Sequence, residues 1–387
     1  MAMIYFDNAA TTPVDERVVL AMTPYHSDIY GNPSSLHAAG REARRALALS
    51  RESIAKWLGA TPAELVFTSG GTEANHLALF GSYLAARETV EVPHYVVSQV
   101  EHHAVLDTMS LLTALGAKVT FVSPDPAGRI APEDVVAAIR PNTVAVSVMA
   151  VNNELGTVQP IEAIALRVKE VNPRIAVHTD AVQALACERL DISHSLVDLA
   201  AFSAHKIHGP KGIGLLYVRA GTRLTVGHVG ARQERGRRPG TENVAGIVGF
   251  AKAVELLEAE WESRQAQVCA VREAFLSRVQ SLPGVTLLSP HDGAPTIVNL
   301  SLAGTESETT LMRMDLAGMA ASAGSACTAG TAEPSHVLLA CGLADDVVRG
   351  AIRFSFSHQN TVEEAETVGV WMERLLTGHA PATLSRQ

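Results

Sequence analysis

The sequence has little cysteine and no long apolar run. Its four cysteines, Cys187, Cys269, Cys327 and Cys341, form no C-x-x-C pair and no cluster with metal-ligand spacing, so neither a disulfide framework nor an intrinsic metal site is predicted. No apolar run approaches the ~20 residues of a membrane-spanning helix. The N-terminus lacks the basic start and the apolar stretch of a signal peptide. We therefore expect a cytoplasmic protein with no membrane partner.

The chain also lacks an excess of positive charge. Its 31 lysines and arginines stand against 40 acidic residues, and the net charge of −9 argues against a nucleic-acid partner. What the chain has is length and apolar content: 387 residues, of which 47% are hydrophobic and 18% charged. This composition is typical of a compact protein with much buried surface, and the length favours two domains.

Strand and helix patterns alternate through the first two thirds of the sequence. Apolar runs of strand length occur at residues 64–68, 95–99, 118–122, 144–151, 175–179 and 196–202, and helical patterns at 36–58, 132–139 and 161–171. This alternation predicts a mostly parallel sheet with helices on both faces. A long helical pattern at 248–282 is expected to lead into a second, smaller α+β domain.

Polar residues gather where the predicted strands end, which is where ligands bind in such sheets. Asp180 follows one apolar run and Lys206 follows the next, 26 positions later. An aspartate and a lysine so placed suit pyridoxal phosphate (PLP): the lysine forms a Schiff base with the aldehyde, and the aspartate keeps the pyridine nitrogen protonated. The alternative for Lys206 is an ordinary charged residue at a strand end. His102 either stacks on the cofactor ring or is a core histidine with satisfied hydrogen bonds.

Two loops have the composition of anion-binding sites. The stretch S-G-G-T-E-A-N opens a helix at Gly71 and Thr72, and free N–H groups at a helix start favour a phosphate. A simple cap by Thr72 explains the stretch equally well. The arginine-rich loop 227–243 either binds an anion or is a solvated surface loop.

Two further residues carry chemical implications. Cys327 lies among small residues in A-S-A-G-S-A-C-T-A-G, which favours a nucleophilic thiol on a mobile loop over a structural cysteine. Its alternative is a cysteine that replaces serine in a flexible turn. Arg353 interrupts an apolar strand, so it needs an anionic partner, which is either a substrate carboxylate or an internal salt bridge.

Taken together, these motifs resemble the cysteine desulfurases of the NifS/IscS type, within the class V aminotransferase group. The resemblance runs nearly end to end. It rests, in order, on D-N-A-A-T-T-P, G-N-P-S-S-L-H, F-T-S-G-G-T-E-A-N, V-E-H-H-A-V-L-D-T, V-N-N-E-L-G, T-D-A-V-Q, S-A-H-K-I-H-G-P-K-G-I-G, R-R-P-G-T-E-N, G-S-A-C-T-A-G-T-A-E-P-S-H-V-L and I-R-F-S. The set around Cys327 discriminates, because related transaminases lack it.

The resemblance implies an α/β fold of PLP fold type I, with a mostly parallel seven-stranded sheet in a large domain (12–260) and a small domain (1–11 plus 261–387). It also implies a role for each matching residue. Catalytic roles fall to Lys206, Cys327 and His102; cofactor contacts to Gly71, Thr72, Asp180, Gln183, Ser203, His205 and Thr241; and substrate contacts to Asn153, Arg353 and Asn32.

The implied reaction converts L-cysteine to L-alanine and leaves a persulfide on Cys327. The sulfur would pass to an iron–sulfur scaffold or another acceptor protein such as a tRNA-thiolation protein, and Cys327 would serve as a transient iron–sulfur ligand with a scaffold. The match of Thr241 implies a homodimer with shared sites. A selenocysteine lyase, another class V transaminase or lyase, and a degenerate relative kept as an assembly partner are the alternatives. Pro239 and the Gly230-Ala231-Arg232 stretch depart from the family pattern beside Thr241.

Overall fold

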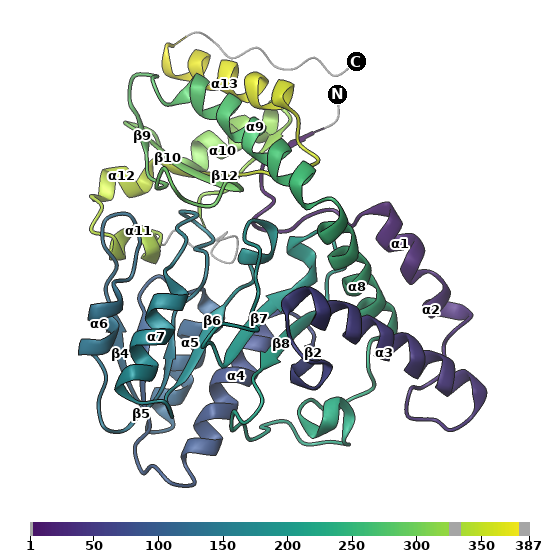
Figure 1. The fold of residues 1–387 in the computed structure, drawn as a ribbon. Coiled ribbons are helices and arrows are strands. Elements are labelled where there is room, and N and C mark those ends of the chain that lie inside the picture. Colours follow the sequence, from purple (N-terminus) through teal and green to yellow (C-terminus); the bar gives the residue numbers. More distant parts are fainter. Residues whose placement is uncertain (1–2, 325–333, 379–387) are drawn as a thin grey trace.

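A computed structural model describes residues 3–324 and 334–378 of the chain. Its larger sheet has seven strands in the order β2-β8-β7-β6-β5-β3-β4 (Figure 1). In that order the strands are β2 (Leu65–Thr68), β8 (Gly214–Val218), β7 (Leu199–Ser203), β6 (Ala176–Asp180), β5 (Thr143–Ser147), β3 (His94–Ser98) and β4 (Lys118–Val122). Only the pairs that include β8 are antiparallel, so the prediction of a mostly parallel sheet is confirmed.

Helices cover both faces of this sheet. They are α3 (Ala38–Leu58), α4 (Gly71–Ala86), α5 (His103–Ala114), α6 (Pro132–Ala137), α7 (Ile161–Val171) and α8 (Val244–Ala259). Two short helices, α1 (Glu16–Met22) and α2 (Pro24–Ser27), pack on α8. The alternation within β7 shows how the layers form: Leu199 and Ala201 share a core with α4, while Ala200 and Phe202 share one with α3, α7 and α8. Two-residue periodicity thus buries both faces of one strand.

A second, antiparallel sheet lies above the first in Figure 1, in the order β12-β10-β9. Its strands are β9 (Val285–Leu287), β10 (Ile297–Leu302) and β12 (Ala351–Ser355), and its helices are α9 (Trp261–Val279), α10 (Ser307–Leu316), α11 (His336–Ala340), α12 (Asp345–Arg349) and α13 (Val362–Leu376). The N-terminal strand β1 (Ile4–Tyr5) pairs with β11 (Met319–Ala320) beside this sheet. A separate apolar core, with Phe6 and Phe275 at its centre, joins these elements.

The structure differs from the sequence-based expectation in three places. Strand β8 was not predicted as a strand of its own. The expected strand 144–151 ends at Ser147. The helical pattern 248–282 forms two helices, α8 and α9, which are separated at Glu260. The carboxylate of Glu260 accepts hydrogen bonds from Arg17 and Arg264.

Over the described ranges 3–324 and 334–378, no helix is long and apolar enough to cross a membrane.

A buried ion pair closes the free edge of the larger sheet at β2. Arg51 of α3 donates two hydrogen bonds to the carboxylate of Glu234, at 2.5 and 2.9 Å, and a third to the carbonyl of Leu65 at 2.7 Å. Glu234 also accepts the backbone N–H of Phe67. The loop that carries Glu234 therefore covers an edge strand that would otherwise present unpaired backbone groups.

We expect Glu234→Ala to lower the free energy of unfolding by about 3–5 kcal/mol, because it leaves the Arg51 guanidinium buried without its carboxylate. Urea unfolding followed by circular dichroism measures the loss. Arg167→Ala is the matched control: it removes an exposed pair with Glu170, which contributes less than about 1 kcal/mol. Equal losses from the two variants would contradict the prediction.

Candidate active site

The predicted polar residues meet at the carboxyl ends of neighbouring strands. Asp180 is the last residue of β6, and Ser203 is the last residue of β7, which lies beside β6 with Asp180 opposite Ala201. A single turn of 3-10 helix, Ala204–Lys206, follows β7 directly. His102 immediately precedes α5. The carboxyl ends of these parallel strands all lie on the same side of the sheet. The parallel register therefore brings together side chains that lie up to 104 positions apart in the sequence.

The carboxylate of Asp180 is buried and held at both oxygens. Oδ2 accepts a hydrogen bond from the side-chain amide of Asn75 on α4 at 2.6 Å, and Oδ1 accepts the backbone N–H of Val182 at 3.0 Å. The two donors fix the position of the Asp180 carboxylate beside α4. A carboxylate held in this way is the group that a pyridinium nitrogen requires.

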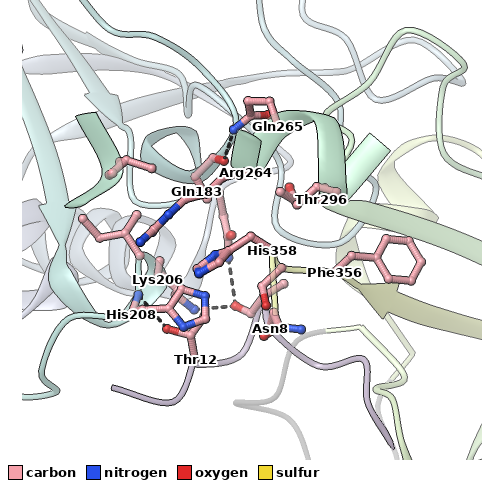
Figure 2. Close-up of a pocket in the computed structure, with 16 residues that line it drawn as sticks. Asn8, Thr12, Gln183, Lys206, His208, Arg264, Gln265, Thr296, Phe356 and His358 are labelled. Carbon is pink, nitrogen blue, oxygen red and sulfur yellow. Dashed lines mark hydrogen bonds between the residues drawn. The ribbon is translucent and has the colours of Figure 1, made fainter. Parts of the chain in front are cut away.

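The amine of Lys206 points back toward the N-terminal segment. Its Nζ donates hydrogen bonds to the backbone carbonyl oxygens of Ala9 and Ala10. The side-chain amide of Gln183 donates to the same Ala9 oxygen at 2.9 Å. Figure 2 shows Lys206 and Gln183 side by side, with Asn8 and Thr12 of that segment close to them. Two backbone carbonyl groups therefore accept hydrogen bonds from the lysine amine.

His102 caps helix α5. Its Nδ1 accepts the backbone N–H of Ala104 at 3.0 Å, so the neutral ring carries its proton on Nε2. Burial is the main cause that lowers the pKa of His102; Asp180 opposes this shift and Lys206 adds to it. The ring is therefore neutral at physiological pH and lies within electrostatic reach of both Asp180 and Lys206.

The predicted phosphate contacts cluster at the start of α4. A Cβ added to Gly71 would approach Cγ2 of Val182 to 2.6 Å and Cβ of Ser203 to 3.7 Å, so this helix start lies against the ends of β6 and β7. The hydroxyl of Ser203 is buried and has no hydrogen-bond partner among the described residues. His205 contacts Thr11 at 3.0 Å, and burial, Lys206 and Lys211 lower its pKa to about 4. Thr72 lies in the first turn of α4.

Arg353 makes an internal ion pair, as the second of its two interpretations predicts. Its guanidinium is almost fully buried and donates to Asp7 at 2.8 Å and to the backbone carbonyl of Asn153 at 2.9 Å. The Nε–H of the same guanidinium is buried without a partner among the described residues. The structure therefore brings Arg353 and Asn153 together and leaves one buried donor unused.

Two predicted site residues lie elsewhere. Asn32 is exposed, and its side-chain oxygen accepts the backbone N–H of Ser34 within its own turn. Thr241 is exposed on the loop before α8. Arginines of the same loop bond to protein groups, for example Arg238 to Glu73 at 2.9 Å, so the loop is less open to anions than its composition predicts. Cys327 lies outside the described residues.

A small cavity of about 40 Å³, lined by both polar and apolar side chains, lies beside Lys206 (Figure 2). The rings of His208 and His358 meet edge to face across it, 4.5 Å apart. Burial is the largest cause that lowers the pKa of His208 to about 3 and that of His358 to about 4. A cavity of this size accommodates water, and Lys206 and Arg264 line it together with the two neutral imidazoles. In the described parts of the chain, no cluster of three or more acidic, histidine or cysteine side chains could hold a metal ion.

Sequence analysis missed several residues of this site. It assigned no role to Asn75 or Glu101, nor to the carbonyl groups of Ala9 and Ala10. Asn75 and Glu101 both lie inside motifs singled out from the sequence, next to residues that were chosen. That proximity is a usable signal, but the sequence does not reveal which polar residue of a motif is buried beneath its neighbour.

Comparison with known proteins places the whole chain in one family. The aminotransferase class-V family matches residues 4–368. The chain is 40% identical to the cysteine desulfurase IscS of Dictyoglomus turgidum, over 96% of this chain and 94% of the relative. It is 42% identical to the putative cysteine desulfurase IscS 1 of Bacillus subtilis, over 95% and 97%.

Solved structures give the same result. A NifS-like protein superposes with a TM-score of 0.91 at 35% identity, over 97% of this chain and all of that one. A structure described as SspA in complex with cysteine superposes with a TM-score of 0.79 at 36% identity, over 91% and 98%. Since the family match spans nearly the whole sequence and the fold agrees with it, the chain belongs to the aminotransferase class-V family.

Proposed function

We propose that this chain is a PLP-dependent cysteine desulfurase, which takes the sulfur of L-cysteine, releases L-alanine and holds the sulfur on Cys327 as a persulfide. The observation that carries the proposal is the meeting of Lys206 and Asp180 at the ends of neighbouring strands. The relatives named cysteine desulfurase, at about 40% identity over nearly the whole chain, point to the reaction.

The residues present fit PLP. The carboxylate of Asp180 suits the pyridinium nitrogen, and Gln183 and His102 lie around the same space. The buried, unpartnered hydroxyl of Ser203 and the first N–H groups of α4 suit the phosphate, since a helix start favours an anion. When bound, PLP supplies an electron sink for the α-carbon of the substrate.

The chain's own groups then have distinct tasks. The Lys206 amine would hold the aldehyde carbon of the cofactor and would be the group that moves a proton at the substrate. The neutral ring of His102 offers a donor at Nε2 rather than a positive charge. Arg353, with the buried Nε–H that lacks a partner, suits the substrate carboxylate beside Asn153.

The sulfur transfer balances without an outside oxidant. The thiolate of Cys327 attacks the sulfur of the substrate, so an S–S bond forms as the substrate's C–S bond breaks. The electron pair of the broken bond stays on carbon, which takes up a proton and becomes the methyl group of alanine. A thiol of ordinary pKa, about 8.5, is only a few per cent thiolate at neutral pH, so a nearby group must accept its proton.

The proposal also covers the oligomeric state of the chain and its location in the cell. The chain acts as a cytoplasmic homodimer, with a large domain at 12–260 and a small one at 1–11 plus 261–387, and passes its sulfur to an iron–sulfur scaffold or another acceptor protein. Support for a second copy comes from residues 19–36, where Leu20, Tyr30 and Leu36 are 71%, 75% and 84% exposed. Exposed apolar side chains gathered in one segment are typical of an interface. Thr241 is exposed as well, as a contact to a neighbouring subunit requires.

We expect Lys206→Ala to abolish the visible absorbance band of the bound cofactor, because no other amine can take the place of Nζ. An absorbance spectrum of the purified protein, after addition and removal of excess PLP, measures this. Lys169→Ala is the control. Lys169 is also largely buried, but it pairs with Asp198 at the amino ends of the strands, away from Lys206. A band that persists in Lys206→Ala, or a wild type that PLP cannot colour, contradicts the proposal.

We expect Cys327→Ser to keep the cofactor band and to lose sulfide release from L-cysteine by at least about 100-fold, because a hydroxyl cannot form the persulfide. Sulfide assays and mass spectrometry of the peptide that contains Cys327 after turnover measure the two effects. Cys269→Ser, at an exposed cysteine on α9, should change neither. Full activity of Cys327→Ser would reject the role of this thiol.

We expect the double variant Leu20→Glu and Leu36→Glu to sediment as a monomer, because charges at these positions would be buried in the proposed interface. Analytical ultracentrifugation measures the mass. Leu316→Glu, at an equally exposed position on α10, should leave the dimer intact. A wild type that sediments as a monomer would exclude the shared site.

A further inference from the structure

Glu101 is an acidic side chain with no exposed surface, in the turn between β3 and α5. Its Oε1 accepts hydrogen bonds from the hydroxyl of Ser98 and from the backbone N–H of Met149, both at 2.6 Å. Its backbone carbonyl accepts a hydrogen bond from His336 of α11 at 3.0 Å. One residue therefore fastens the end of β3 to the chain after β5 and to α11, directly beside His102.

The two carboxylate oxygens of Glu101 are unequal. Oε1 has two donors, whereas Oε2 is buried and has no partner among the described residues. The carboxylate of Asp180 lies within electrostatic reach and has a donor on each oxygen. Two like charges in one buried region are unfavourable. Each oxygen of Asp180 has a donor whereas Oε2 of Glu101 has none, so Glu101 is the carboxylate that the surrounding donors support less well as an anion.

We propose that Glu101 is a positioning residue that occupies the folded site as a neutral carboxylic acid, so that it seats His102 while the negative charge stays on Asp180 alone. This inference rests on the proposed function, in which those two residues face the cofactor. It adds a residue to the site that never touches cofactor or substrate. Ionisation of Glu101 would place a second negative charge close to the carboxylate of Asp180.

The proposal has a definite consequence for the pH dependence of stability. Burial, followed by the charge of Asp180, raises the pKa of Glu101 to about 8, whereas an unfolded glutamate has a pKa near 4.3. The folded protein thus binds this proton more tightly than the unfolded chain. The stabilisation is complete below about pH 4 and is lost as the pH rises toward 8. The titratable groups around Glu101 are Asp180 on β6, His102 beside it and His336 on α11.

The test compares urea unfolding of the wild-type holoenzyme and Glu101→Gln, at saturating PLP and equal protein concentration, from pH 5 to 8. Gln cannot ionise, so the ratio of the two unfolding constants should change by up to about tenfold per pH unit, with the wild type losing stability as pH rises. Glu262→Gln, at an exposed position on α9, should show a constant ratio to wild type. A constant ratio for Glu101→Gln as well would overturn the proposal.

A second measurement needs no variant that has to fold. Infrared spectra of wild-type protein, isotope-labelled at the glutamate carboxyl carbon, should show one protonated glutamate that persists at neutral pH and disappears on unfolding. Absence of that band from the folded protein would overturn the proposal. Both readouts are independent of sulfide release, so failure of the desulfurase proposal and failure of this one are distinguishable.

The variant Ser98→Ala removes a donor to Oε1 of Glu101. In this variant the band of the protonated glutamate should be lost at a higher pH than in the wild type.

Discussion

The site depends on a backbone contact between the lysine turn and the N-terminal segment. The carbonyl groups of Ala9 and Ala10 accept the hydrogen bonds of the Lys206 amine. The same segment reaches the smaller sheet, where Asp7 pairs with Arg353 and the backbone N–H of Ala9 donates to Ser355. Four residues, Asp7 to Ala10, therefore contact both the candidate catalytic amine and the candidate carboxylate-binding arginine. Neither sheet alone could fix the two groups relative to each other.

Burial keeps the histidines of this region neutral. The pKa values of His102, His205, His208 and His358 are all lowered, and burial is the largest cause in each case. These histidines consequently contribute hydrogen bonds without positive charge at physiological pH. The cations that remain are lysines and arginines, which are the residues best suited to the anionic groups of PLP and of an amino acid. A site for two anions is thus built without an accumulation of titrating cations.

The sequence predicted the sheet and most of the site because both follow from local patterns. Strand-length apolar runs gave the parallel strands, and the polar residues after them, Asp180 and Lys206, are adjacent once parallel strands share an edge. Strand β8 was not predicted because its residues follow the lysine turn without a helix between them. The alternation of strand and helix patterns that indicated the other strands is therefore absent there. Partners such as Asn75 of Asp180, or Asp7 of Arg353, depend on packing between segments more than 100 positions apart. No periodicity within the sequence encodes such contacts.

The pairing of the two chain ends has a consequence for synthesis of the protein. The backbone N–H of Ser355 donates to the carbonyl of Phe6, and the side chain of Asn8 bonds to Ser355 and Asn360. Because a ribosome delivers residue 355 long after residue 6, the contacts that hold the acceptors of the lysine amine can form only after residue 355 has been synthesised. The larger sheet can assemble earlier, since its strands are complete at Val218. The order of synthesis therefore makes the strands of the larger sheet available before the residues that complete the site.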